Sequence, residues 1–158
     1  MIAYKPIGLI HTPFKRREGM PIQPAGAEGL RGLVEIFPEY QSGLKDIEGF
    51  SHLILIYHFH RSEGFELLVT PFMDTTTRGV FATRAPKRPN SIGMSTVRLV
   101  KVDRGALHVE NVDMIDGTPL LDVKPYVPSF DDQCSVRIGW LERATADVAD
   151  KRADSRFT

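Results

Sequence analysis

The sequence has a single cysteine, no long apolar run and no excess of charge of either sign. Cys134 has no second thiol for an internal disulfide or a cysteine-rich zinc site, which fits the reducing cytoplasm. No segment approaches the roughly 18 apolar residues of a membrane span, and the first residues lack the pattern of an export signal. With 20 basic and 20 acidic residues the formal net charge is zero, so nucleic-acid binding would need a local basic patch.

Three common motifs of nucleotide binding and covalent catalysis are also missing. The chain has no G-x-x-x-x-G-K-[ST] P-loop and no G-x-G-x-x-G between a strand and a helix, which disfavours a phosphate cradle and a Rossmann fold. It has no G-x-S-x-G elbow, and no histidine lies near Cys134 in the sequence, so covalent catalysis has weak support. A cofactor enzyme with this sequence needs another type of binding site.

Short apolar runs separated by Gly and Pro make up most of the 158 residues. This pattern predicts one all-β domain, a closed barrel or sandwich, because closure removes exposed sheet edges. One short helix is expected over Tyr40–Ile47, closed by Gly49, and a hairpin turn is expected at Asp103–Gly105. Strands are expected at Tyr4–Ile10, Gly32–Ile36, Ser51–His60, Glu66–Val69, Gly79–Thr83, Ser95–Val102, Ala106–Val112, Leu120–Lys124 and Ser135–Trp140.

The end of the chain differs in character from the rest. Residues 143–158 are small or charged and carry few large apolar side chains. Such a segment buries too little apolar surface to offset the entropy of ordering it. We expect a barrel domain over residues 1–142, followed by a charged tail that is a frayed helix or disordered.

A basic, proline-stiffened loop follows the apolar run that begins at Gly79. Pro86 and Pro89 fix two backbone angles, so the polar side chains around them lose little freedom on binding. This loop suits an anionic or polar partner, although a solvated surface turn has the same composition. Its candidate binding residues are Arg84, Lys87, Arg88 and Asn90.

Three histidines of matching parity form a second candidate site. His52, His58 and His60 lie on one face of the expected strand, and the other face, with Leu53 and Leu55, is expected to be core. Two histidines separated by one residue can hold a metal, but no carboxylate or cysteine of matching position supports them. We therefore expect no metal, a hydrogen-bonded structural role for His52, and a place for His60 at a pocket rim.

A third constellation begins at Asp116-Gly-Thr-Pro119, which has the composition of a turn. A plain β-turn explains this segment as well as a binding loop does. Beyond it, Asp122 and Lys124 lie on one face of an expected strand, and Pro125 ends the ladder just before Tyr126. Charged residues within an apolar strand are expected to be paired or functional, because burying either alone is costly.

These residues, taken together, resemble the TsaA-like family, whose best-understood members are TrmO-type (YaeB) tRNA methyltransferases. The resemblance spans about residues 4–130, and its specificity comes from the order of many short segments. The matching segments are Ile7–Lys15, Ile22–Pro24, Gly49–Leu53, Tyr57–His60, Gly79–Arg84, Arg88–Asn90, Ile92–Ser95, Asp116–Pro119 and Asp122–Tyr126.

The resemblance implies a compact β-barrel that binds S-adenosylmethionine without a Rossmann fold, usually as a homodimer with sites near the subunit interface. It implies methylation of N6-threonylcarbamoyladenosine at position 37 of tRNA. The cofactor site would comprise Gln23, Pro24, Ala25, His60, Arg61, Arg78, Asp116, Gly117, Thr118 and Pro119. The substrate side would comprise Arg84, Lys87, Arg88, Asn90 and Lys124, with Tyr126 and Asp122 as candidate catalytic groups.

Departures from the family pattern keep two other functions open. Ala85 stands where a serine is usual and Ser91 where a proline is usual, and the small domain that follows the barrel in longer bacterial relatives is missing. A basic track through Lys15–Arg17 and the loop at Arg84–Arg88 is one way to bind tRNA; a solvated loop is the other interpretation of Lys15–Arg17. The alternatives are a methyltransferase with another acceptor and a non-catalytic ligand-binding barrel.

Overall fold

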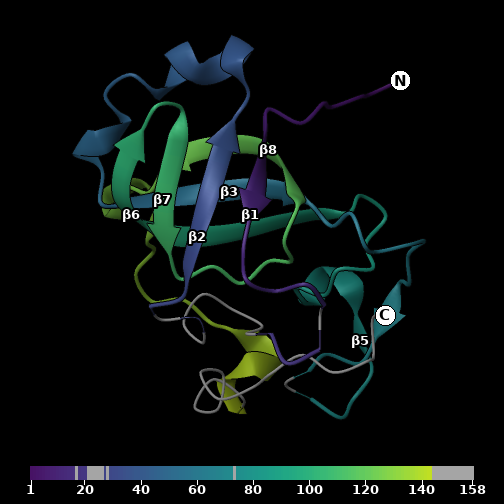
Figure 1. Cartoon of the computed structure of the whole chain (residues 1–158). Helices are drawn as coiled ribbons and strands as arrows, with labels where there is room; N and C mark the ends of the chain where they lie inside the picture. The colour runs from purple at the N-terminus through teal and green to yellow at the C-terminus, as the bar shows by residue number, and fades with distance from the viewer. Residues whose placement is uncertain (17, 21–26, 28, 73, 144–158) are drawn as a thin grey trace.

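A closed antiparallel β-barrel forms the body of the protein in the computed structural model (Figure 1). The structure describes residues 1–16, 18–20, 27, 29–72 and 74–143. Around the barrel the strands follow the order β1, β2, β7, β6, β3, β8, and β8 pairs with β1 to close it. The prediction of a closed all-β barrel is confirmed. The barrel strands are β1 (Gly8–His11), β2 (Arg31–Ile36), β3 (His52–His58), β6 (Ile92–Asp103), β7 (Ala106–Glu110) and β8 (Thr118–Pro125).

Alternation along each strand supplies the core. In β3, Leu53, Leu55 and Tyr57 are buried inside the barrel, while His52 and His58 lie on the outer face. Period-two alternation places successive side chains on opposite faces, so every barrel strand contributes alternate residues to one interior. This confirms the predicted apolar face of the strand. The fully buried core side chains include Ile10, Val34, Leu53, Leu55, Val97, Leu107, Val109, Val112 and Leu120.

Because neighbouring strands are antiparallel, some connections leave from one end of the barrel and the others leave from the opposite end. Residues 12–30, 59–91 and 111–117 leave from one end, which is the lower end in Figure 1. We call it the loop end. The opposite end carries the 3-10 helices η2 (Pro38–Leu44) and η3 (Ile47–Gly49) and the hairpin between β6 and β7. The segments that carry most of the predicted cofactor residues therefore meet at one end.

The predicted hairpin at Asp103–Gly105 is confirmed. Arg104 and Gly105 both have positive φ, 47° and 81°, which is the backbone that a two-residue hairpin turn of this type requires. A Cβ at position 105 would also meet the side-chain amide of Gln41 in η2, which would have to shift. Gln41 itself donates a hydrogen bond to the Ile36 carbonyl and fastens η2 to the barrel.

The connection 59–91 folds into a small unit beside the loop end, which we call the arm. It contains the two-stranded pair β4 (Leu68–Val69) and β5 (Arg78–Gly79), followed by the 3-10 helix η4 (Val80–Ala82). Val69, Val80 and Ala85 form a separate small core against which Phe72 packs. The arm therefore has a small core of its own, while Phe59 at its start packs against the barrel core beside Tyr57.

Several expected elements are corrected by the structure. Tyr4–Ile10 is a strand only from Gly8, and Gly79–Thr83 continues from β5 into the 3-10 helix η4. The expected helix at Tyr40–Ile47 is a pair of 3-10 helices, of which η3 includes Gly49. Ser135–Trp140 forms no strand; Ser135 has a φ of 55°, which breaks an extended run. The remaining expected strands are present with ends shifted by a few residues.

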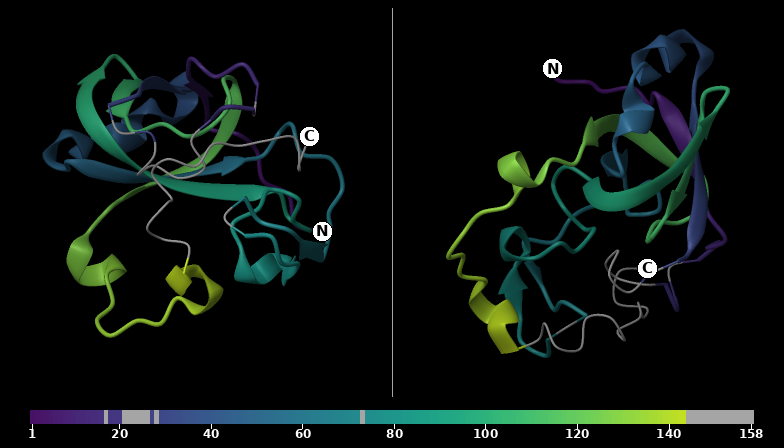
Figure 2. Two further views of the ribbon diagram at one scale, coloured as in Figure 1. Left: turned by 90° about the horizontal axis from the view of Figure 1, so that it is seen from below. Right: turned by 90° about the vertical axis from the view of Figure 1, so that its left-hand side faces the viewer.

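After β8 the chain leaves the barrel and returns to the arm. It forms the short helix α1 (Pro128–Asp131), which was not expected, and the 3-10 helix η5 (Gly139–Arg143). Both views in Figure 2 show this segment running outside the barrel toward the arm. Residues 144–158 of the expected tail lie outside the described residues. Within the described ranges, no helix has the length and apolarity to cross a membrane.

The close pairing of β1 with β2 predicts a strict requirement for glycine at position 8. A Cβ on Gly8 would overlap the backbone carbonyl oxygen of Glu35, which the β1–β2 pairing holds in place. We expect Gly8→Ala to lower the free energy of unfolding by about 1–3 kcal/mol, as overpacking does elsewhere. Urea denaturation measures this. Gly43→Ala is the control, since no described atom lies within 4 Å of that Cβ; an equal loss in both variants would contradict the prediction.

Candidate functional site

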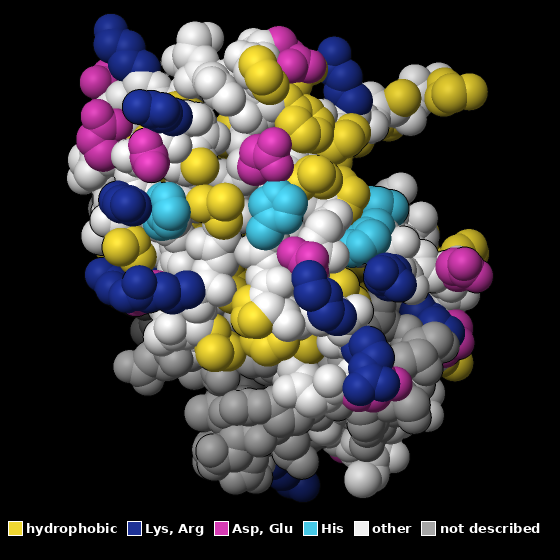
Figure 3. Space-filling view, viewed as in Figure 1, with side chains coloured by type: hydrophobic (Ala, Val, Ile, Leu, Met, Phe, Trp, Pro, Cys, Tyr) yellow, Lys and Arg dark blue, Asp and Glu magenta, His cyan; other side chains and the backbone are white. Residues whose placement is uncertain are grey.

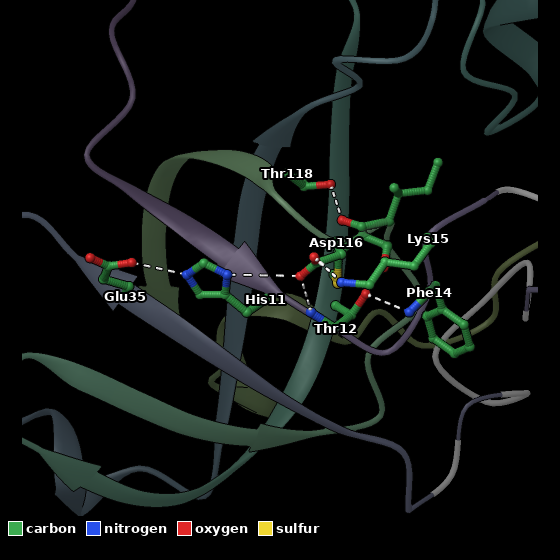
Figure 4. A network of polar contacts seen from close by, with 9 residues as sticks. His11, Thr12, Phe14, Lys15, Glu35, Asp116 and Thr118 are labelled. Atoms are coloured by element: carbon green, nitrogen blue, oxygen red, sulfur yellow. Dashed lines mark hydrogen bonds and ion pairs between the residues drawn. The ribbon is translucent and has the colours of Figure 1, made fainter.

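Hydrogen bonds join two connections of the loop end, residues 12–30 and residues 111–117 (Figure 4). The Thr12 amide donates to Asp116 Oδ1 at 2.9 Å, and the Asp116 amide donates to the Phe14 carbonyl at 2.7 Å. The buried Thr12 hydroxyl donates to the Met114 carbonyl at 2.8 Å. Residues about a hundred positions apart thus form one structural unit, and Asp116-Gly-Thr-Pro119 is more than an isolated turn.

Cationic and donor groups surround the Asp116 carboxylate. Lys15 Nζ lies 2.5 Å from Asp116 Oδ2, and His11 Nδ1 lies 3.8 Å from Oδ1. His11 Nε2 is also 2.9 Å from Glu35 Oε2, so this imidazole lies between two carboxylates. The hydrogen bond from Lys15, followed by that from the Thr12 amide, lowers the pKa of Asp116 below its ordinary value. Asp116 therefore presents a carboxylate that stays ionised at neutral pH.

The Arg88 side chain donates hydrogen bonds to three backbone carbonyls of the arm. Its Nη1 donates to the carbonyls of Val80, Thr83 and Ala85 at 3.1, 2.9 and 3.3 Å. Lys87 is directed to Glu66, with Nζ 3.5 Å from Oε1, and the Glu66 amide donates to the Lys87 carbonyl. Charged groups that satisfy several carbonyls stabilise irregular backbone. In this structure Lys87 and Arg88 therefore build the loop in which Arg84 and Asn90 are exposed.

Arg78 on β5 is held from two sides. Its guanidinium donates to the Asp74 carboxylate through Nε and Nη2, both at 2.7 Å, and this interaction lowers the pKa of Asp74. Its other contact is the ring of Trp140, whose centroid lies 5.5 Å from Arg78 Cζ. Trp140 Nε1 in turn donates to the Ala82 carbonyl at 2.8 Å. The C-terminal segment is thereby fastened to the arm, a contact that sequence analysis did not anticipate.

His60 and Arg61 occupy the turn directly after β3, where the arm begins. Partial burial, with the nearby charge of Arg61, lowers the pKa of His60 below its ordinary value. His60 is therefore neutral at pH 7, and its ring has one donor and one acceptor nitrogen. The structure does not place it on the strand face of His52 and His58, because β3 ends at His58. Among the described residues no group of three or more candidate ligands could hold a metal ion.

Sequence analysis did not predict a series of hydrogen bonds that joins three polar side chains at the loop end. The Tyr57 hydroxyl lies 2.8 Å from Ser95 Oγ, and Ser95 Oγ donates to Asp113 Oδ1 at 2.6 Å. Burial raises the pKa of Asp113 to about 6, although the hydrogen bond from Ser95 and the charge of Arg84 act in the opposite direction. The only sequence signal was polar Ser95 at an inward position of a strand, where it requires a partner.

The outer wall of the barrel carries the remaining candidates. Lys124 Nζ is 2.9 Å from Asp122 Oδ2, so the predicted pairing of these two charges is confirmed. Both side chains are about half exposed, on the face opposite the core. Tyr126 lies beyond the end of β8, where its hydroxyl donates to Asp132 Oδ1 at 2.8 Å. Within one chain, Tyr126 is thus at the barrel end opposite the loop end.

The loop end brings together most of the predicted cofactor residues but not all of the predicted site. The elements at this end contribute His60, Arg61, Arg78, Asp116, Gly117, Thr118 and Pro119, together with Arg84 and Asn90. Gln23, Pro24 and Ala25 lie outside the described residues, as does Arg17 of the expected basic track. Lys15 of that track is paired with Asp116, and on the face in Figure 3 basic side chains alternate with acidic ones.

Comparison with known proteins agrees with this architecture. The model of the tRNA-methyltransferase O N-terminal domain family matches residues 9–132, which is most of the chain. The fold and the loop-end site thus define a small barrel of the type found in that family. The chain belongs to the tRNA-methyltransferase O family.

Individual relatives extend the comparison. A probable S-adenosyl-L-methionine-binding protein of Pyrococcus abyssi is 57% identical over 157 residues, covering 99% of this chain and 85% of the relative. A tRNA (adenine(37)-N6)-methyltransferase of Mus musculus is 37% identical over 134 residues, covering 80% of this chain but only 31% of the mouse protein. The crystal structure of TrmO from Pseudomonas aeruginosa superposes with a TM-score of 0.75 at 37% identity, covering 89% of this chain and 62% of that one.

The contacts of Arg88 predict a local effect that Trp140 can report. Trp140 is the single tryptophan of the chain, and its Nε1 donates a hydrogen bond to the Ala82 carbonyl. Ala82 lies between Val80 and Thr83, whose carbonyls accept hydrogen bonds from Arg88. All three carbonyls are bound by Nη1, and a lysine side chain ends one bond short of that position, so its ammonium cannot keep the three contacts. We therefore expect Arg88→Lys to shift Trp140 fluorescence to longer wavelength and to lower the free energy of unfolding by about 1–3 kcal/mol.

Fluorescence and urea denaturation test this on the same samples. Arg104→Lys, an exposed change in the hairpin at the opposite end, is the matched control and should leave both quantities unchanged. An unchanged emission spectrum in Arg88→Lys would show that the arm does not need the three-carbonyl contact.

Proposed function

We propose that this chain is an S-adenosylmethionine-dependent methyltransferase that acts on N6-threonylcarbamoyladenosine at position 37 of tRNA. The observation that carries this proposal is the pair of hydrogen bonds that joins the Asp116 turn to the Thr12 segment at the loop end. The barrel that holds them belongs to the tRNA-methyltransferase O family. Relatives named as S-adenosylmethionine-binding proteins and as tRNA adenine-37 methyltransferases agree with both parts of the proposal.

The loop end suits the chemistry of this cofactor. An ionised carboxylate at Asp116 can accept hydrogen bonds from ribose hydroxyls or from the ammonium of the methionine moiety. Neutral His60 and backbone groups of the Gly117–Pro119 segment can bind uncharged polar edges, and Arg78 and Arg61 can pair with a carboxylate. The cofactor, when bound, supplies an electrophilic methyl group, so the protein has to align the acceptor and exclude water. Gln23, Pro24 and Ala25 complete the proposed cofactor site.

Arg84 and Asn90 are the proposed contacts to tRNA on the arm. Both are exposed, and the contacts of Lys87 with Glu66 and of Arg88 with loop carbonyls support this contact surface from behind. A tRNA substrate places the protein in the cytoplasm. Phosphate contacts dominate such binding, and because the net charge of the chain is zero, shape and the modified base contribute much of the affinity.

We further propose that the active form is a homodimer. Asp122 and Lys124 face outward from the barrel wall and Tyr126 lies at the opposite end, so their participation in the reaction would require the loop end of a second chain. The outer face near Asp122 and Lys124 includes exposed Ile92 and Met94, which lie beside the outward Ile56. An exposed apolar strip of this kind is typical of a protein interface. Tyr126 and Asp122 stay candidate catalytic groups and Lys124 a candidate substrate contact on this basis.

Another acceptor is the second candidate function. The pairing of Lys15 with Asp116 and of Lys87 with Glu66 leaves little unpaired positive charge among the described residues of these two segments, which favours a substrate less charged than tRNA. Incubation of the protein with S-adenosylmethionine and tRNA carrying threonylcarbamoyladenosine, followed by mass spectrometry of the nucleosides, separates the two. We expect the methylated nucleoside to form; its absence, with cofactor binding intact, would favour the other acceptor.

The Asp116 carboxylate predicts a specific loss of cofactor affinity. Asp116→Asn keeps an oxygen for the Thr12 amide but removes the negative charge. Hydrogen bonds to charged groups contribute about 1.5–3 kcal/mol, so we expect Kd for S-adenosylmethionine to rise about 10- to 100-fold. Isothermal titration calorimetry measures it. Asp103→Asn, at an exposed carboxylate of the opposite barrel end, should bind as the wild type does; equal affinity in all three proteins would remove Asp116 from the site.

A further inference from the structure

Asp113 lies where three parts of the loop end converge. Tyr57 comes from β3, Ser95 from β6 and Asp113 from the connection between β7 and β8, and hydrogen bonds of 2.8 and 2.6 Å join them in series. The charge of Arg84, on the arm, acts on both Asp113 and Tyr57.

The backbone on either side of Asp113 is fixed. The Val112 amide donates to the Leu30 carbonyl at 3.3 Å, and the Met114 carbonyl accepts the buried Thr12 hydroxyl at 2.8 Å. Asp113 is three residues from Asp116 in the same connection, so one rigid segment carries both carboxylates. Their environments differ: Asp116 has Lys15 and the Thr12 amide beside it, whereas Asp113 is partly buried and accepts a hydrogen bond from Ser95.

The Asp113 carboxylate is the final acceptor in this series of hydrogen bonds. Ser95 Oγ carries one proton and donates it to Asp113 Oδ1, so the Tyr57 hydroxyl donates to Ser95. Burial raises the pKa of Tyr57, so it remains a neutral donor. The Ser95 hydroxyl, itself bonded to Tyr57, thus orients the carboxylate without neutralising it, an arrangement that fits a group that must gain and release a proton.

We propose that Asp113 accepts the proton that the acceptor nitrogen loses during methyl transfer, and that Ser95 and Tyr57 position its carboxylate. This inference rests on the proposed function. As the nitrogen forms its bond to the methyl carbon, the bond from that carbon to the sulfonium sulfur breaks and its electron pair stays on sulfur. The N–H proton passes to a carboxylate oxygen of Asp113 and then to solvent, so atoms and charge balance.

The acid–base behaviour of Asp113 supports this role. A pKa of about 6 lies close to neutral pH, where a general base combines sufficient basicity with an ionised state. The titratable groups that act on it are Tyr57, which stays neutral, and Arg84, whose positive charge favours the carboxylate. Asp122 and Tyr126, the two candidates from the sequence, are paired with Lys124 on the outer wall and with Asp132 at the opposite end.

The sign of the stability effect separates a functional group from a structural one. The pKa of Asp113 is higher in the folded chain than its ordinary value of 3.8, so folding favours the protonated acid. Stability from this group is therefore greatest below pH 3.8, declines between about pH 4 and 6, and is lost above pH 6. A buried carboxylate that lowers stability at neutral pH is typical of a site where function requires it.

Asp113→Asn tests the inference, because asparagine keeps the size and one acceptor oxygen but cannot take the proton. We expect cofactor binding by calorimetry to be unchanged, the single-turnover methylation rate to fall about 10²- to 10⁴-fold, and thermal stability at pH 7 to rise. The pH dependence of stability between pH 4 and 7 should become flatter than in the wild type. Ser95→Ala should show a smaller loss of rate, and Asp103→Asn none.

Each other outcome points to a specific error. Methylation by Asp113→Asn at the wild-type rate would overturn the inference while leaving the proposed function intact. Loss of rate together with loss of stability at pH 7 would assign Asp113 a structural role and also overturn it. A wild-type protein that binds the cofactor but does not methylate the modified tRNA would remove the proposed function, and the role of Asp113 with it. A larger loss of rate in Asp122→Asn or Tyr126→Phe than in Asp113→Asn would return the proton-accepting role to those residues.

Discussion

Closure of the barrel through the pairing of β1 with β8 is the constraint on which the rest of the structure depends. Once six antiparallel strands form a ring, neighbouring strands must run in opposite directions, and alternate connections must emerge at the same end. Segments around positions 12, 60–90 and 111–117 are thus neighbours without being neighbours in sequence. The hydrogen bonds of Thr12 with Asp116 and Met114 then set how these connections pack.

Three positive charges of the arm act on the protein itself and give the arm its shape. Arg88, Lys87 and Arg78 are each directed to carbonyls or carboxylates of the protein, so an irregular segment with a very small core keeps a defined form. The single tryptophan fastens the returning C-terminal segment to the same unit. Positive charge in this loop is therefore first a structural requirement, and a neutral chain can carry a basic loop without binding nucleic acid broadly.

Asp113 and Asp116 lie on one connection, but their different positions relative to the barrel shift their pKa values in opposite directions. Asp116 is surrounded by donors at the rim, which keep its pKa low, whereas Asp113 reaches Ser95 inside the wall, where burial raises its pKa. Pairs of acids with separated pKa values are a common arrangement in sites that need one fixed charge and one group that exchanges protons. The same connection thus combines electrostatic binding with acid–base capacity, and the free-energy cost of Asp113 falls on the stability of the fold.

The sequence by itself determined the strands and their inward faces, because alternation in β3 and β6 and the turn at Asp103–Gly105 are local properties. It also determined the family, through the order of short motifs. Tertiary structure alone decided that Arg88 binds carbonyls, that Tyr126 lies opposite the loop end, and that Asp113 accepts a hydrogen bond from Ser95. These depend on register and closure between distant segments, and a side chain's pKa and partners follow from those neighbours, which no local pattern records.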